Sequence, residues 1–289
     1  MTAAVPPVPL ARPGPDREPP SGTRLTVLPA SSQFAEISRP IVRQTEPVAP
    51  RRVERGVVAF DLDGTILDDL DAISRVAADV LFRAFGTAPE EARIHYLATT
   101  GMPFEAQLAQ LYPGTPVDQR ASTARTFHQR KVQEAYAHAE PFREIPKVLK
   151  RLAEDRWTLV VTTGAETEMA DLLLEREGLR FWFESVLGSG EGTKREHLAE
   201  YRRRFPEVPI FLVGDSRFDM EAAQSVEGVV PLGRATRVPG WTLTPSDLEQ
   251  WGARWADYSL SELPATLDRL GTTRGTDRPR SRTTTRRRS

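Results

Sequence analysis

Cysteine is absent from this sequence of 289 residues, and histidine occurs only four times. Without cysteine there can be no disulfide, thiolate zinc site, iron–sulfur cluster or cysteine nucleophile. The histidines show no HExxH pattern and no pair at metal-ligand spacing: His95, His128, His138 and His197. No apolar run approaches the roughly 18 residues of a membrane helix, and the Pro-broken N-terminus lacks the apolar segment of a signal peptide. We therefore expect a cytoplasmic chain with no membrane partner.

The net charge of −1 conceals an uneven distribution. Residues 1–55 carry eight Arg and five acids, and residues 271–289 carry seven Arg and one Asp. The two ends therefore hold +3 and +6, which leaves −10 on the body between them. Residues 1–50 also hold 11 of the 24 prolines, and proline fixes φ and removes a backbone donor. We predict a disordered Pro-rich leader over 1–54 and a disordered Arg-rich tail over 271–289.

Short apolar runs alternate with helical patterns in the body. The runs that indicate buried strands are 56–60, 157–163, 184–188, 210–214 and 228–232. Apolar residues at helical spacing predict a helix over 70–85, with Asp68 or Asp69 as its cap. This alternation predicts an α/β fold, a Rossmann-like parallel sheet with flanking helices. The core is expected over 55–68 and 140–270, and the purely helical stretch 69–139 is an insertion after the first strand.

The strongest motif is Asp61-Leu62-Asp63-Gly64-Thr65, directly after the first predicted strand. Open α/β sheets bind ligands at this edge. Acids at i and i+2 on a strand point the same way, and two carboxylates about 4 Å apart repel by roughly 4 kcal/mol at an effective dielectric near 20. A cation or a shared proton would resolve that repulsion. The alternative is a turn-forming, helix-capping DG, which the preceding buried strand makes the weaker interpretation.

Three further signals follow later strands. Gly214-Asp215-Ser216-Arg217-Phe218-Asp219 places two acids one helical turn apart, where helix capping is the alternative interpretation, stronger for Asp219 than for Asp215. Thr162-Thr163-Gly164 ends another strand, and hydroxyls and N–H groups at such a turn suit a phosphoryl group, although they are also ordinary turn residues. Lys194 starts a predicted helix, where a lone lysine is usually solvated.

Together these four motifs resemble those of the haloacid dehalogenase superfamily of phosphotransferases, over residues 56–270. The helical insertion matches the position of the family's helical cap. This likeness, with the ending Ala256-Asp257-Tyr258…Glu262-Leu263-Pro264, is greatest to phosphoglycolate-phosphatase-like members. The longer, Trp-rich segment 233–255 departs from the family pattern, and we interpret it as a satellite core rather than a lid or a partner surface.

The resemblance implies a Mg²⁺-dependent phosphatase that acts on a small phosphorylated metabolite. Asp61 would form an aspartyl-phosphate, and Asp63 would act as general acid and then as general base. Mg²⁺ would be held by the Asp61 carboxylate, the Asp63 carbonyl and Asp215, with Asp219 in support. Thr162, Thr163, Gly164 and Lys194 would bind the phosphoryl group. Thr100 and Gly101 would lie in a substrate-facing cap loop, with a plain helix–helix turn as the alternative.

Two other functions remain open from the sequence. A sugar-phosphate mutase of the same fold would return the phosphoryl group to a sugar instead of to water. A nucleic-acid-associated phosphatase or binding protein would use the Arg-rich tail for salt-sensitive binding. Against nucleic acid, the body is net acidic and the tail has no aromatic residue for base stacking. A non-catalytic scaffold is disfavoured because all four motifs are intact.

Overall fold

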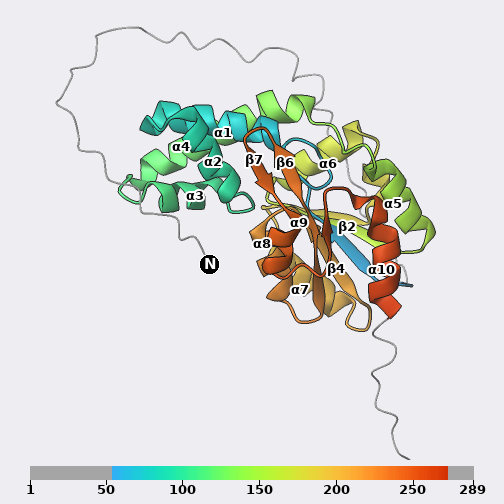
Figure 1. Ribbon diagram of the computed structural model, residues 1–289. Coiled ribbons are helices and arrows are strands. Elements are labelled where there is room, and N and C mark those ends of the chain that lie inside the picture. Colours follow the sequence, from blue (N-terminus) through green and yellow to red (C-terminus); the bar gives the residue numbers. More distant parts are fainter. Residues whose placement is uncertain (1–53, 273–289) are drawn as a thin grey trace, which may run out of the picture. The chain divides into compact units, whose positions relative to one another are not determined.

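The computed structural model describes residues 54–272, and Figure 1 shows them as ribbons. The strands are β1 (Val57–Phe60), β2 (Thr158–Thr162), β3 (Ser185–Leu187), β4 (Ile210–Gly214), β5 (Val229–Arg234), β6 (Thr236–Val238), β7 (Trp241–Leu243) and β8 (Ala256–Asp257). The α-helices are α1 (Leu70–Phe85), α2 (Pro89–Ala98), α3 (Phe104–Leu111), α4 (Val117–Arg130), α5 (Ile145–Glu154), α6 (Thr167–Arg176), α7 (Lys194–Arg204), α8 (Arg217–Gln224), α9 (Pro245–Gln250) and α10 (Leu263–Thr272). Shorter helical turns are η1 (Lys131–Ala135), η2 (Tyr136–His138), η3 (Arg180–Trp182) and η4 (Leu260–Glu262). No helix in this part of the chain is long and apolar enough to cross a membrane.

Six strands form one sheet in the order β3-β2-β1-β4-β5-β8, and every neighbouring pair is parallel. The predicted α/β class and the five predicted strands are thus confirmed. The first strand of the described residues, β1, lies at the centre, with Phe60 opposite Val161 of β2 and Val213 of β4. The carboxyl ends of these three strands therefore meet at one edge of the sheet.

Helices cover both faces of the sheet, and alternate residues of β1 point to opposite faces. Val58 and Phe60 belong to the larger core, with buried residues of α5, α6 and α10. Val57 and Ala59 belong to a second core, with Leu198 and Tyr201 of α7 and Ala223 of α8. Asp61 is two residues after Ala59 and four after Val57, so its side chain points to the same face of the sheet, the one covered by α7 and α8.

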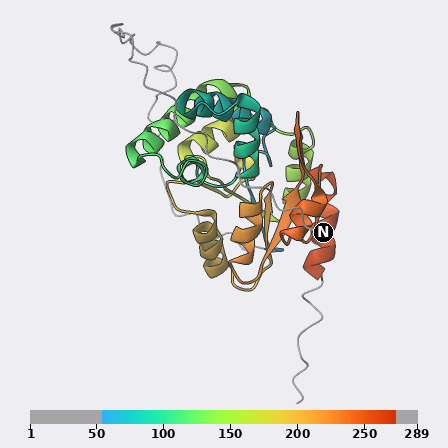
Figure 2. The same ribbon diagram turned by 60° about the vertical axis from the view of Figure 1, so that its left-hand side comes forward.

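Between β1 and α5 the chain forms only helices, α1 to α4 with η1 and η2. Figures 1 and 2 show these helices as a group at one end of the sheet. We call residues 70–138 the helical cap. Its centre is an aromatic cluster in which Phe127 stacks on Phe104 with ring centroids 4.0 Å apart and Tyr96 packs against both. The larger core is continuous from these rings to the sheet, so the cap and the sheet share one apolar interior.

The predicted N-cap residue of α1 is confirmed in position but not in its hydrogen bond. Asp69 occupies the N-cap position, but its side chain makes no capping hydrogen bond to the helix. Its Oδ1 instead accepts a hydrogen bond from the backbone N–H of Gly64, 3.0 Å away. A carboxylate that the sequence pattern assigned to the helix therefore braces the loop that follows β1.

The Trp-rich segment 233–255 contains the β6–β7 hairpin and α9. Its interior is a small apolar cluster against which Trp241 and Trp251 pack, formed by Met220, Ala235, Leu243, Leu248 and Ala253. The predicted satellite core is confirmed. The hairpin also reaches the helical cap, because the guanidinium of Arg93 in α2 donates a hydrogen bond to the carbonyl of Pro239.

The predicted ends of the chain lie almost entirely outside the described residues. Of the leader 1–54 only Glu54 is described, and of the tail 271–289 only Gly271 and Thr272, which complete α10. In the described residues, the helices of 70–138 lie in the sequence between β1 and the other strands of the six-stranded sheet.

Candidate active site

The carboxyl edge of the sheet brings the sequence motifs together. Asp61 directly follows β1, and the register places it beside Thr162 at the end of β2 and Gly214 at the end of β4. Asp215 comes next after β4, and Asp219 lies in the first turn of α8. Residues that are up to 158 positions apart in the chain thus meet because β1 lies between β2 and β4.

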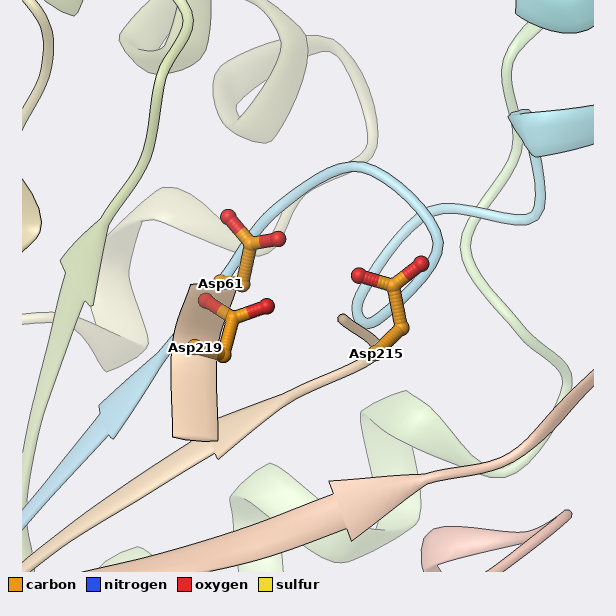
Figure 3. A group of neighbouring side chains, drawn as sticks. All are labelled: Asp61, Asp215 and Asp219. Atoms are coloured by element: carbon orange, nitrogen blue, oxygen red, sulfur yellow. The ribbon is translucent and has the colours of Figure 1, made fainter. Parts of the chain in front are cut away.

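Three of the predicted carboxylates form one buried group. Oxygens of Asp61, Asp215 and Asp219 all lie within 4.8 Å of one another, and Figure 3 shows the three side chains converging from β1, β4 and α8. Asp61 is 5% exposed, Asp215 3% and Asp219 0%. Buried carboxylates at this spacing repel strongly, so the arrangement requires positive charge or bound protons.

Lys194 supplies one positive charge to this group. Its Nζ lies 2.8 Å from Asp61 Oδ1 and 2.5 Å from Asp219 Oδ1. The ammonium begins α7, where the helix dipole disfavours a cation, and a capping box between Thr193 and Glu196 fixes the helix start that aims it inward. Burial alone would lower the pKa of Lys194, but the charges of Asp219 and Asp61 outweigh it and raise the pKa. The lysine side chain is 12% exposed, so it is a largely buried cation paired with two carboxylates and not a solvated one.

The remaining charge of the group fits a divalent cation. Burial raises the pKa of Asp61 to about 7, against the opposing effect of Lys194, and burial with the neighbouring charges of Asp61 and Asp219 raises the pKa of Asp215 well above its usual range. Three carboxylates and one ammonium carry two net negative charges when ionised. Among the described residues, the Asp215 carboxylate has no cationic partner within ion-pair distance. Its oxygens and those of Asp61 are the hard donors that a metal ion would take.

Asp219 serves a different purpose from Asp215. Its Oδ2 accepts hydrogen bonds from the backbone N–H of Ser216 at 3.1 Å and from the Ser216 hydroxyl at 2.5 Å, closing a capping box at the start of α8. Its Oδ1 is held by Lys194. The helix-capping interpretation of Asp219 is confirmed, and both of its oxygens already have partners within the chain. Asp219 nevertheless lies in the carboxylate group, so helix capping and membership of this group do not exclude each other.

Gly64 is required for the close approach of two motifs. Its φ is +70°, in the left-handed region that favours glycine, and a Cβ built at this position would lie 2.3 Å from Asp215 Oδ2. Any side chain here would displace the Asp215 carboxylate. The glycine of the first motif thus keeps room for the aspartate of the fourth.

The side chain of Asp63 lies outside the carboxylate group. Its Oδ2 is 2.6 Å from the ammonium of Lys131, and both carboxylate oxygens accept a hydrogen bond from the Tyr136 hydroxyl at 2.9 Å. Both partners belong to the last turns of the helical cap, so Asp63 joins cap and core. Of the four residues predicted to hold a metal, Asp63 is the one whose contribution would come from its backbone carbonyl, as the motif resemblance implies.

Asp69 adds a buried carboxyl beside the half-buried Asp63. Burial, followed by the charge of Asp63, raises the pKa of Asp69 well above its usual range. Asp63 is thus placed between an ammonium, a phenol and a second carboxyl.

The hydroxyls of Thr162 and Thr163, at the turn after β2, make different contacts. Thr162 is fully buried, and its Oγ1 lies 2.8 Å from Nδ1 of His197. Thr163 braces the turn itself, because its Oγ1 accepts a hydrogen bond from the N–H of Ala165 at 3.1 Å. Gly164 is exposed at the tip of the turn, with open space on its Cβ side. Of the three residues of this turn that are predicted to bind the phosphoryl group, Thr162 is the one that the strand register places beside Asp61.

The cap loop that contains Thr100 and Gly101 lies against the start of α8. A Cβ at Gly101 would be 2.3 Å from the Ser216 hydroxyl, and the φ of Gly101 is +88°. Thr100 lines a small cavity of about 40 Å³ together with Ser216, Arg217 and Trp241. Because Ser216 follows Asp215, this loop lies against the fourth motif.

Three residues of this site carry no motif in the sequence. Lys131 and Tyr136 lie 68 and 73 residues after Asp63, and only the return of the cap to the core brings them together. His197 was noted only as one of four scattered histidines. Its spacing of three from Lys194 places both on one helix face, and that signal could have identified it.

Comparisons with known proteins agree with this geometry. The sequence profile of the haloacid dehalogenase-like hydrolases matches residues 58–229. A phosphoglycolate phosphatase of Rhodobacter capsulatus is 28% identical over 232 residues, which cover 72% of this chain and 95% of that protein. "Probable phosphatase IndB" of Dickeya dadantii (strain 3937) is 32% identical over 136 residues, 46% of this chain and 58% of that relative's length.

Solved structures show the same fold. The crystal structure of a predicted phosphatase from Clostridium acetobutylicum superposes with a TM-score of 0.62 at 20% identity, covering 75% of this chain and 99% of that one. A haloacid dehalogenase-like family hydrolase from Streptococcus pneumoniae gives a TM-score of 0.60 at 21% identity, covering 73% of this chain and 98% of that one.

Proposed function

The chain belongs to the haloacid dehalogenase-like hydrolases and is an enzyme of their phosphatase type, and from this premise we propose that it hydrolyses a small phosphorylated metabolite through an aspartyl-phosphate on Asp61. One observation carries the proposal. The Asp61 carboxylate stands at the carboxyl edge of the sheet, in contact with a buried ammonium and grouped with two further buried carboxylates. A nucleophile that must approach an anionic phosphoryl group needs positive charge beside it, and the Lys194 ammonium supplies one such charge while the carboxylate group calls for a further cation.

The chemistry is assigned to two carboxyl groups. An Asp61 oxygen would bond to phosphorus while the bond from phosphorus to the ester oxygen breaks, and protonated Asp63 would give its proton to the leaving alcohol. Water would then attack the same phosphorus and transfer its proton to Asp63, which releases phosphate and restores Asp61. Lys131 and Tyr136 support this role because they fix the position of the Asp63 carboxylate.

Lys194 and Thr162 are proposed to bind the phosphoryl oxygens. The ammonium already lies 2.8 Å from the nucleophile, and the Thr162 hydroxyl lies at the adjacent strand end. Thr163 would act through the turn that it braces, and Gly164 through its exposed backbone N–H. Lys194 also offsets the repulsion between Asp61 and Asp219, so it serves the free enzyme as well as the substrate complex.

We propose Mg²⁺ as the cofactor, held by the carboxylates of Asp61 and Asp215 and the carbonyl of Asp63, with Asp219 in support. The two net negative charges of the buried group and its oxygen-only donors support this choice. When bound, the ion would neutralise charge on the transferring phosphoryl group. Gly64 keeps the Asp215 carboxylate in place for that purpose.

The helical cap is proposed to select the substrate. Thr100 and Gly101 lie next to Ser216, and Lys131 and Tyr136 enter from the other end of the cap. 2-Phosphoglycolate is the first substrate to test, because the relative from Rhodobacter capsulatus, aligned over nearly its whole length, carries that activity in its name.

The test is release of inorganic phosphate from p-nitrophenyl phosphate and from a panel of phosphorylated metabolites that includes 2-phosphoglycolate. We expect activity with Mg²⁺, loss of activity in EDTA, and loss in Asp61→Asn. Full activity in that variant would refute the assignment of the nucleophile. Isomerisation of a sugar phosphate that outpaces phosphate release would instead indicate a mutase.

A further inference from the structure

A buried histidine behind the phosphoryl-binding residues is not explained by the proposed mechanism. His197 lies on α7, three residues after Lys194, and is 3% exposed. Its Nδ1 lies 2.8 Å from Oγ1 of Thr162. Its Nε2 is buried and has no hydrogen-bond partner among the described residues. The ring thus makes a single polar contact, and that contact is to a residue of the candidate site.

Because Nε2 has no partner, the two neutral forms of the His197 ring differ in which hydrogen-bond donor is left unpaired. In the Nε2–H form, a buried N–H donor would be left without an acceptor. In the Nδ1–H form, Nε2 is left with an empty lone pair, and the donor without an acceptor is the Thr162 hydroxyl, which stands beside Asp61 at the sheet edge where a bound group can accept its proton. Burial also lowers the pKa of His197, which favours the neutral ring. The neutral Nδ1–H form is therefore the one that this environment favours.

This choice fixes the direction of the hydrogen bond to Thr162. If Nδ1 carries the proton, the ring donates and Thr162 Oγ1 accepts, so the hydroxyl proton remains free to point elsewhere. If Nδ1 were the acceptor, the only hydroxyl proton would be used on the ring. The described residues offer Thr162 Oγ1 no other hydrogen-bond partner.

The free proton would point toward the site because of the strand register. Thr162 follows Val161, which pairs with Phe60, so Thr162 stands beside Asp61 at the same edge. Both side chains point to the same face of the sheet as Val57, Ala59 and Val160, which pack against α7. A phosphoryl group on Asp61 would accept the proton that the ring does not take.

We propose that His197 is a positioning residue that donates from Nδ1 to Thr162 and so leaves the Thr162 hydroxyl free to donate to the phosphoryl group of the substrate. The inference rests on the proposed function for its catalytic consequence, but not for the tautomer. It assigns a role to α7 beyond carrying Lys194, since one helix face then positions both a cation and a hydroxyl donor for the same group.

The test combines two amide variants that resemble different halves of the ring. In His197→Asn the amide nitrogen overlays Nδ1 and keeps a donor for Thr162, whereas in His197→Gln the amide reaches the position of Nε2. With p-nitrophenyl phosphate we expect kcat/KM to fall about tenfold in His197→Gln and less than about threefold in His197→Asn, as for loss of one charge-assisted hydrogen bond. Equal losses in the two variants would overturn the inference.

A double-mutant cycle distinguishes action through Thr162 from a general loss of packing. Thr162→Val removes the hydroxyl, so adding His197→Gln to it should cause no further fall in kcat/KM. An equal further fall in the double variant would show that the ring acts by another route. Thermal unfolding of each variant, measured alongside, shows that the compared proteins are folded.

The tautomer is read directly in the wild-type protein. Nitrogen-15 NMR of the ring distinguishes the two forms, and the His197 signals are assigned as those missing from His197→Asn. We expect the Nδ1–H pattern, and an Nε2–H pattern would overturn the inference. If the wild-type protein hydrolysed no phosphomonoester, the proposed function would fail, while the tautomer would still decide the assignment of this hydrogen bond.

Discussion

Replacing Lys194 by methionine should strongly lower the free energy of unfolding of the metal-free protein. Methionine has a similar length and is tolerated in buried sites, so the change removes the charge with little loss of volume. It leaves Asp61, Asp215 and Asp219 grouped within 4.8 Å without the ammonium that now contacts two of them. The variant therefore tests whether the carboxylate group is held together by this one cation.

The size of the effect follows from two distances. At an effective dielectric near 20, ion pairs at 2.8 and 2.5 Å contribute roughly 6 and 7 kcal/mol before solvation is considered. Burying the ammonium offsets a large part of this, and removal of one partner from a buried ion pair typically costs about 3–5 kcal/mol. Proton uptake by the carboxyls limits the loss at low pH, because the pKa of Asp61 is about 7 even beside Lys194. The loss should therefore be larger at pH 8 than at pH 5.

The assay is urea unfolding in EDTA, followed by circular dichroism at both pH values. The matched control is Lys150→Met on α5, an exposed lysine whose Nζ is 3.9 Å from Glu154 and whose removal should change the free energy of unfolding by less than about 0.5 kcal/mol. A Lys194→Met protein as stable as this control at pH 8 would refute the electrostatic account of the site.

Three other outcomes follow from the same geometry. The pKa of Asp61 is raised from 3.8 to about 7, so this carboxyl holds its proton more tightly in the folded chain than in the unfolded chain. The resulting contribution to stability is complete below pH ~4 and is lost as the pH rises through 7. Metal-free wild-type protein should accordingly lose melting temperature between pH 5 and pH 8, and Mg²⁺ should raise it more at pH 8; equal stabilisation at both pH values would contradict this. Gly64→Ala places a Cβ 2.3 Å from Asp215 Oδ2 at a φ of +70°. It should lower the free energy of unfolding in urea by about 1–3 kcal/mol and lower activity at least tenfold. The control Gly114→Ala places its Cβ in open space and should change neither quantity. Tyr136→Phe removes the hydroxyl that donates to Asp63 at 2.9 Å, so kcat for p-nitrophenyl phosphate should fall about threefold to tenfold, and an unchanged kcat would show that the hydroxyl does not position Asp63.

The sheet and the central carboxylates were predictable because their signals are local. An apolar run that ends in an aspartate indicates both a buried strand and a ligand-binding edge, and this pattern located Asp61 and Asp215. The strand β8 was not predicted because two residues, Ala256 and Asp257, carry no periodicity. The β6–β7 hairpin was missed although Pro239-Gly240 is a common turn signal.

The contacts that complete the site are long-range and depend on packing. Nothing near Asp63 in the sequence indicates that its partners are Lys131 and Tyr136, since the whole helical cap lies between them. Asp69 was assigned to a helix end from residue type alone, but the N–H of Gly64 competes for the same carboxylate. Sequence patterns therefore located the carboxylates at the sheet edge better than they located the groups that hold them.

The central position of β1 has a consequence for how the chain acquires its site during synthesis. Of the strands in the described residues, the one that precedes Asp61 is made before the others, and its two neighbours begin only at Thr158 and Ile210. Until Ile210–Gly214 has been synthesised and has paired, one edge of β1 is open and Asp61 lacks the strand that carries Asp215. Such non-local pairing is slow and leaves an exposed strand edge in the meantime. A ribosome-released fragment that ends before β4 would consequently be inactive and prone to aggregate, so the site forms late and as a unit.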